Sequence, residues 1–104
     1  MASDLNVVVT SGVIESAPSI VLTRHNNRVC VFTLKNTEEF ILANGRPARH
    51  VNIVTIEALG RNVDKCMTKL VPGNRIRIHG YYRVDDVNGV LKTRLRMHYF
   101  ELEP

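Results

Sequence analysis

Apolar and polar residues alternate along most of this chain with a period of two, which is typical of strands that bury one face. The first such segment is rich in Val and Ile and carries Gly12, which favours a bend or bulge in a curved strand. Pro18 interrupts the segment, and the apolar run after it can continue the strand around a corner. We predict five strands, at residues 5–15 with an extension at 19–23, then at 28–36, 49–58, 75–84 and 90–102.

The segments between these strands predict one helix, one long loop and one hairpin. Residues 59–71 place their apolar side chains on one face of a short amphipathic helix, and a Pro-Gly pair ends it. The apolar face consists of Leu59, Val63, Cys66, Met67 and Leu70. Residues 37–48 contain Gly and Pro and predict a long loop. Residues 85–89 predict a hairpin tip, in which Asn88-Gly89 is a favourable turn pair.

Three strands, a helix and a two-stranded hairpin are the element order of the OB-fold. This all-β fold is a five-stranded Greek-key barrel with its helix between strands three and four. We therefore predict a single OB-fold domain over residues 1–104, a length that suits one domain. An SH3-like barrel, which lacks the helix, and an α+β sandwich are the alternatives.

The net charge is confined to one part of the chain. The net charge is +4 for the whole chain. Residues 75–98 contain six Lys and Arg residues and two acidic residues, Asp85 and Asp86, so this segment accounts for all of the net charge. Such asymmetry predicts a polyanionic partner, either nucleic acid or a membrane surface. No apolar run is long enough to span a membrane, and the first residues lack the basic region of a signal peptide. We expect a cytoplasmic, nucleoid-associated protein without membrane contact.

Alternation on the last two strands predicts a basic face. Each of the two strands has one polar face and one apolar face. If both apolar faces cover the same core, the polar faces lie side by side and bring together Arg75, Arg77, His79, Tyr81 and Arg83 with Lys92, Arg94, Arg96, His98 and Phe100. Like charges on neighbouring strands destabilise a sheet, so stability alone would favour mixed signs. Tyr81 is the candidate base-stacking residue of this face, or it covers a neighbouring strand. Tyr82 is expected to point inward, into the core.

The predicted loop supplies a second candidate patch. Phe40 lies there with Arg46 and Arg49 close by in the sequence. A loop phenylalanine beside arginines can stack on a base. The alternative is that Phe40 is buried against the barrel.

Signals for catalysis and for metal binding are poor. The chain has no nucleophile elbow, zinc-protease, phosphate-loop or Cys-x-x-Cys motif. Its four His are scattered, and Asp85-Asp86 is typical of a turn rather than of a metal site. Cys30 and Cys66 lie in apolar patterns and are expected to be small core residues. We predict no catalytic residue, no metal and no cofactor.

Several motifs resemble the bacterial single-stranded DNA-binding proteins and their relative, primosomal replication protein N. The likeness runs over residues 6–102, from the opening NVVVTSGVIESAP through VCVFTL at 29–34 to HVNIVTIEALGRNVDKCMTKLVPGNRIRIHGYYR at 50–83. The stretch KLVPGNRIRIHGYYR is its most specific part. Phe40, His50 and Val87 fall where the family has base-stacking Trp residues, whereas this chain has no Trp.

The resemblance implies a protein that binds single-stranded DNA with little sequence preference in replication or recombination. It also implies a homodimer or homotetramer that pairs through the first strand. The acidic tail of the main family is missing, which favours a specialised member, either primosomal or from a phage or plasmid. The alternative is a replisome adaptor whose basic face docks replication or primosome proteins, followed by an RNA chaperone and lastly an enzyme.

Overall fold

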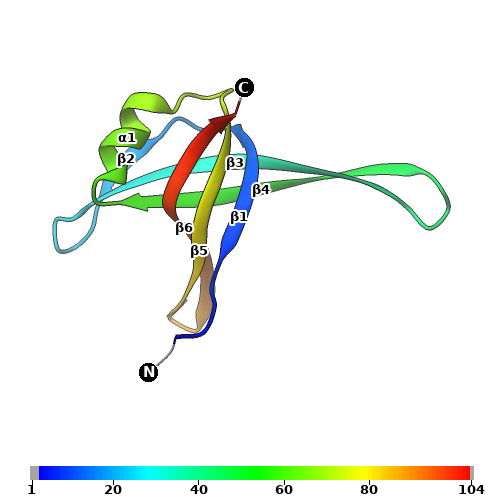
Figure 1. The fold of residues 1–104 in the computed structure, drawn as a ribbon. Coiled ribbons are helices and arrows are strands. Elements are labelled where there is room, and N and C mark those ends of the chain that lie inside the picture. Colours follow the sequence, from blue (N-terminus) through cyan, green and yellow to red (C-terminus); the bar gives the residue numbers. More distant parts are fainter. Residues whose placement is uncertain (1–2, 104) are drawn as a thin grey trace.

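The computed structural model describes residues 3–103, so Met1, Ala2 and Pro104, at the ends of the predicted domain, lie outside the described residues. It contains six strands and one helix: β1 (Val8–Ile14), β2 (Ser19–Leu22), β3 (Arg28–Ile41), β4 (Pro47–Leu59), α1 (Asn62–Lys69), β5 (Arg75–Val87) and β6 (Val90–Glu103). The sheet order is β1-β5-β6-β4-β3-β2, and pairing of β1 with β3 closes five strands into a barrel. This arrangement confirms the predicted OB-fold and excludes both alternatives (Figure 1).

The barrel core follows the predicted alternation. Phe32, Leu34, Ile56, Ile76 and Ile78 are each at most 1% exposed and belong to one cluster. β2 continues the first strand beyond Pro18 and pairs with β3 next to the helix, as predicted for a strand that turns a corner.

Two glycines allow backbones to approach closely within the barrel. A Cβ atom on Gly12 would overlap the carbonyl oxygen of Lys35, and one on Gly80 would overlap that of Arg96. Gly12 therefore lies where β1 bends from β5 toward β3, as predicted for a glycine that allows a bend in a curved strand.

The helix covers one end of the barrel but is shorter than predicted (Figure 1). Leu59 ends β4 instead of starting the helix, because Gly60 turns the chain with a φ of 60°. Val63, Cys66 and Leu70 are buried as predicted, whereas Met67 is 41% exposed. Within residues 3–103, no helix is long and apolar enough to cross a membrane.

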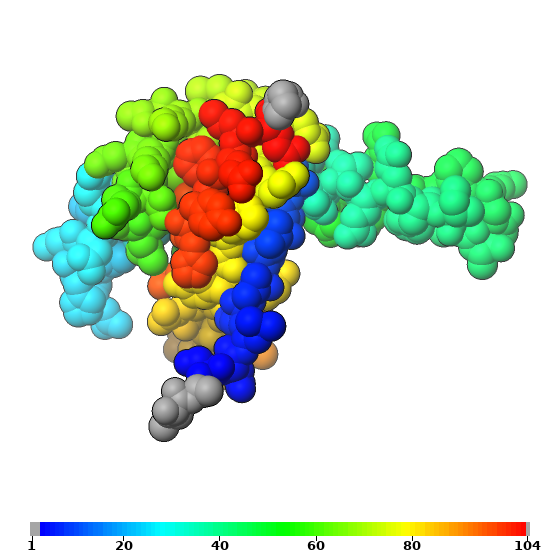
Figure 2. All heavy atoms as spheres, in the orientation of Figure 1, coloured from blue at the N-terminus to red at the C-terminus, as the bar shows by residue number. Residues whose placement is uncertain are grey.

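The prediction of a long loop at 37–48 is wrong. β3 and β4 stay paired from Val29↔Leu59 to Ile41↔Pro47, so that only residues 42–46 turn the chain. The outer part of this hairpin projects from the barrel as a two-stranded ribbon (Figures 1 and 2). Both faces of such a ribbon meet solvent, so its sequence carries no clear apolar alternation.

The predicted hairpin tip at 85–89 is also too long. β5 and β6 pair up to Val87↔Val90 and leave a two-residue turn. Asn88 and Gly89 both have positive φ, 53° and 80°, as expected for a tight hairpin turn.

Candidate nucleic-acid interface

The side of β5 and β6 that points away from the core is here called the outward face. Tyr81 pairs with Arg96, Arg83 with Arg94, and Asp85 with Lys92, so these side chains share that face. Arg75, Arg77 and His79 continue it along β5, alternating with buried Ile76, Ile78 and Gly80. The outward face thus contains eight of the ten residues predicted for the basic face: Arg75, Arg77, His79, Tyr81, Arg83, Lys92, Arg94 and Arg96.

A β-bulge changes the far end of the outward face. His79 pairs with Tyr99 while Gly80 pairs with Met97, so His98 is the extra residue. Beyond it, Phe100 turns inward and packs against the core, and its predicted place on the basic face is wrong. Tyr99 takes an outward position instead, and its ring stacks on His79 with the centroids 4.3 Å apart.

The same shift brings two carboxylates onto the outward face. Nε2 of His79 lies 3.1 Å from Oε1 of Glu101, and Nε of Arg77 lies 3.5 Å from Oε1 of Glu103. The positive potential is therefore weaker at this end than the sequence count predicts. It is concentrated toward the hairpin end, where Arg83, Lys92 and Arg94 lie.

An arginine network joins the outward face to β4. Glu57, only 8% exposed, accepts hydrogen bonds from Nη1 of Arg94 at 3.1 Å and from Nε of Arg96 at 3.2 Å. Asp85 lies 3.7 Å from Nε of Arg83 and 3.8 Å from Nη2 of Arg94. Sequence reasoning missed Glu57, whose one signal is a lone acid within the apolar run IVTIEAL.

The two tyrosines of β5 lie on opposite faces. Tyr81 is half-buried on the outward face, with its ring centroid 4.9 Å from that of His98. Tyr82 is 50% exposed, so its predicted place in the core is wrong. It lies on the core side of the sheet beside Leu95, which is the last residue toward the hairpin end at which β6 pairs with β4.

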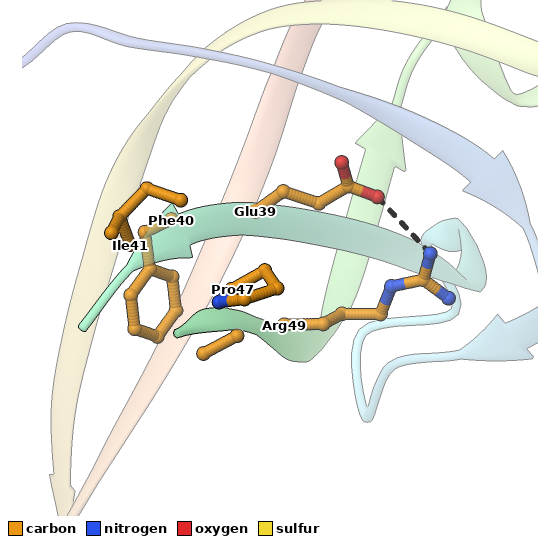
Figure 3. A pocket seen from close by; sticks show the side chains of 6 residues that line it. Glu39, Phe40, Ile41, Pro47 and Arg49 are labelled. Atoms are coloured by element: carbon orange, nitrogen blue, oxygen red, sulfur yellow. Dashed lines mark hydrogen bonds and ion pairs between the residues drawn. The ribbon is translucent and has the colours of Figure 1, made fainter. Parts of the chain in front are cut away.

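The projecting ribbon carries the second candidate patch, here called the ribbon tip: residues 39–42 and 46–49. Phe40 is 45% exposed and pairs with the small Ala48, so it is not buried against the barrel. Around it lies a shallow hollow of about 450 Å³ lined by Glu39, Phe40, Ile41, Pro47, Ala48 and Arg49 (Figure 3). Arg49 is held by Glu39 at 3.0 Å. Arg46 and His50 are exposed, and His50 pairs with Glu38.

The two cysteines lie in the core, as predicted. Cys30 and Cys66 are both 0% exposed. Burial raises the pKa of both thiols, that of Cys66 to about 12, so they are protonated and poorly nucleophilic at neutral pH. Within residues 3–103, no three side chains of His, Cys, Asp or Glu lie close enough to hold a metal ion.

Comparison with known proteins agrees with this architecture. A sequence model of the Single-strand binding protein family matches residues 5–102. The chain therefore belongs to the single-strand binding protein family. No curated protein matches it as a close relative.

Solved structures similar to this chain share its fold. A Plasmodium falciparum SSB in complex with ssDNA has a TM-score of 0.83 at 18% identity, over 98% of this chain and 96% of that one. A small single-stranded DNA-binding protein from Streptomyces coelicolor has a TM-score of 0.69 at 16% identity, over 97% and 96%. The single-stranded DNA binding protein from Thermus aquaticus, as a deletion mutant, has a TM-score of 0.85 at 16% identity. The match covers 96% of this chain but only 51% of the Thermus chain.

Proposed function

We propose that this protein binds single-stranded DNA with little sequence preference, in replication or recombination, and performs no chemistry on it. Membership of the single-strand binding protein family supports the ligand. The observation that carries the proposal is the outward face, where cations of both hairpin strands surround Tyr81 in register. No observation favours the adaptor alternative.

Phosphate neutralisation on this face would depend mainly on its exposed cations. Within residues 3–103, Arg75 and Lys92 make no ion pair, and Arg83 makes only a long one to Asp85 at 3.7 Å. Tyr81 on the outward face and Phe40 on the ribbon tip would stack on bases. Neither contact distinguishes one base from another, which accounts for the low sequence preference.

Fluorescence anisotropy of a labelled oligo-dT, titrated at several salt concentrations with duplex competitor, tests this function. Replacing Arg83 and Lys92 together by Ala should reduce the log–log salt slope by about 1.4, from ~0.7 for each lost phosphate contact. The matched control replaces Arg24, in the turn before β3, and Arg61, before α1, by Ala. Equal losses in both double variants, or equal affinity for duplex, would contradict the proposal.

We also propose that the protein pairs with a second copy through β1. β1 pairs with β5 along its length but reaches β3 only at Val13 and Ile14, which leaves one edge unpaired over most of the strand. The atoms of β1 are exposed on the side of the molecule shown in Figure 2 (blue). Val7, just before β1, is 65% exposed, and Val9, within it, is 56% exposed. An exposed apolar edge is a liability that dimerisation removes. Sedimentation equilibrium should show a dimer that Val9→Glu dissociates, whereas a monomeric wild type would contradict pairing.

A further inference from the structure

One carboxylate of the outward face bridges two guanidinium groups. Oδ1 of Asp85 lies 3.7 Å from Nε of Arg83, and its Oδ2 lies 3.8 Å from Nη2 of Arg94. Both distances exceed hydrogen-bond length, so the pairs are held by charge attraction alone. All three side chains are partly open to solvent, at 37% for Asp85, 49% for Arg83 and 33% for Arg94.

The second carboxylate on Arg94 is held very differently. Glu57 accepts from Nη1 of Arg94 at 3.1 Å, and its side chain is only 10% exposed. Its other oxygen is occupied by Arg96 at 3.2 Å. Arg94 is thus held by a hydrogen bond through Nη1, whereas Asp85 is only a weakly held partner of its Nη2.

We propose that the space between Nε of Arg83 and Nη2 of Arg94 is a phosphate subsite for single-stranded DNA, which Asp85 occupies in the free protein. This inference rests on the proposed function. A backbone phosphate presents one negative charge and oxygen acceptors, as the carboxylate does, and binds guanidinium groups well. It can therefore replace Asp85 without leaving either arginine unpaired.

The neighbouring residues support this exchange. Lys92 is the cross-strand partner of Asp85 and makes no ion pair within residues 3–103, so it can receive the displaced carboxylate. Tyr81 lies two residues from Arg83 on the same face, about 7 Å along the strand. A nucleotide whose phosphate is bound in the subsite can therefore extend its base toward the Tyr81 ring.

Asp86 provides a matched control within the same hairpin. It carries the same charge one residue away, but alternation places it on the opposite face, where it pairs with Leu91. Its Oδ1 accepts the Gly89 backbone N–H at 2.9 Å, a bond that an Asn side chain can retain. Asp85→Asn and Asp86→Asn therefore change the net charge equally and differ only in which face they change.

The test compares wild type, Asp85→Asn and Asp86→Asn for oligo-dT binding at several salt concentrations. Asp85→Asn should tighten binding roughly two- to fivefold, the range that an exposed ion pair of this kind is worth. It should also steepen the salt slope by about 0.7, which is one more net phosphate contact. Asp86→Asn should leave the affinity within roughly 1.5-fold of wild type, because its exposed carboxylate lies on the opposite face, contacts neither arginine and is separated from the subsite by solvent.

Three results would overturn the inference. Equal tightening in both variants would mean that only long-range charge matters, and an unchanged or weakened Asp85→Asn would mean that Asp85 does not compete with DNA. A wild type that binds no single strand at any salt concentration would overturn the proposed function as well. Circular dichroism of each variant checks that the fold is retained.

Discussion

Replacing Phe40 by alanine should weaken binding of single-stranded DNA while leaving the barrel intact. The ring lies on the ribbon tip, outside the core cluster, with Ala48 across from it. Because 45% of Phe40 is exposed, roughly 90 Å² of a side chain of about 200 Å² remains available to a base. At about 25 cal/mol per Å², full covering of that area contributes about 2 kcal/mol.

This free energy corresponds to roughly a thirtyfold loss of affinity, and to about fivefold if only half of the area is covered. The assay is anisotropy of labelled oligo-dT at fixed salt, with urea unfolding of each variant in parallel. Stability should change by less than about 0.5 kcal/mol, as for a surface substitution.

Two further substitutions separate base stacking from a merely apolar contact. Phe40→Trp keeps a ring and should bind at least as tightly as wild type, whereas Phe40→Leu keeps apolar area without a ring and should bind with an affinity between those of wild type and Phe40→Ala. Affinity within twofold of wild type for Phe40→Ala would refute the reasoning. Full affinity in Phe40→Leu together with a loss in Phe40→Ala would show that the ring is not used for stacking.

Three other predictions concern buried residues. Glu57→Gln should lower the free energy of unfolding by about 1–3 kcal/mol, because the buried carboxylate that pairs with Arg94 and Arg96 loses its charge. The control Glu101→Gln, at an exposed position, should lower it by less than about 0.5 kcal/mol. Equal losses for the two variants in urea unfolding would contradict this prediction. Gly80→Ala should lower the melting temperature strongly, because the new methyl group overlaps the Arg96 carbonyl oxygen; an unchanged melting temperature would contradict the backbone approach. Because the pKa of Cys66 is raised from 9.0 to about 12 in the folded state, its contribution to stability should be complete below pH 9. That contribution should fall by about 1.4 kcal/mol per pH unit between about pH 9 and pH 12. The decline should be smaller in Cys66→Ala, and an identical decline in both proteins would contradict the assignment.

The sequence predicted the barrel wherever a strand buries one face. Ile76 and Ile78 alternate with Arg75 and Arg77, so both the strand and its outward face could be predicted. The projecting ribbon could not be predicted. Residues 37–41 and 47–51 pack against no core, so they show no clear apolar alternation, and the Gly and Pro content of residues 37–48 is also typical of a loop.

Most residues of the candidate site could be predicted from the sequence, but the cross-strand pairs that they form could not. Alternation cannot reveal the bulge at His98, which depends on how closely Gly80 approaches Arg96. One extra residue exchanged Phe100 for Tyr99 and brought Glu101 onto the outward face. Glu57 was missed because its arginine partners come from β6, and only the closed barrel brings these strands together.

The central claim is that single-stranded DNA contacts the outward face and the ribbon tip. Ultraviolet cross-linking of a thymidine oligonucleotide, with mass spectrometric mapping of the attached residues, tests it most directly. The account predicts cross-links at Tyr81 and Phe40 that duplex DNA does not compete away. Cross-links confined to α1 or β2, with none on β5, β6 or the ribbon tip, would contradict it.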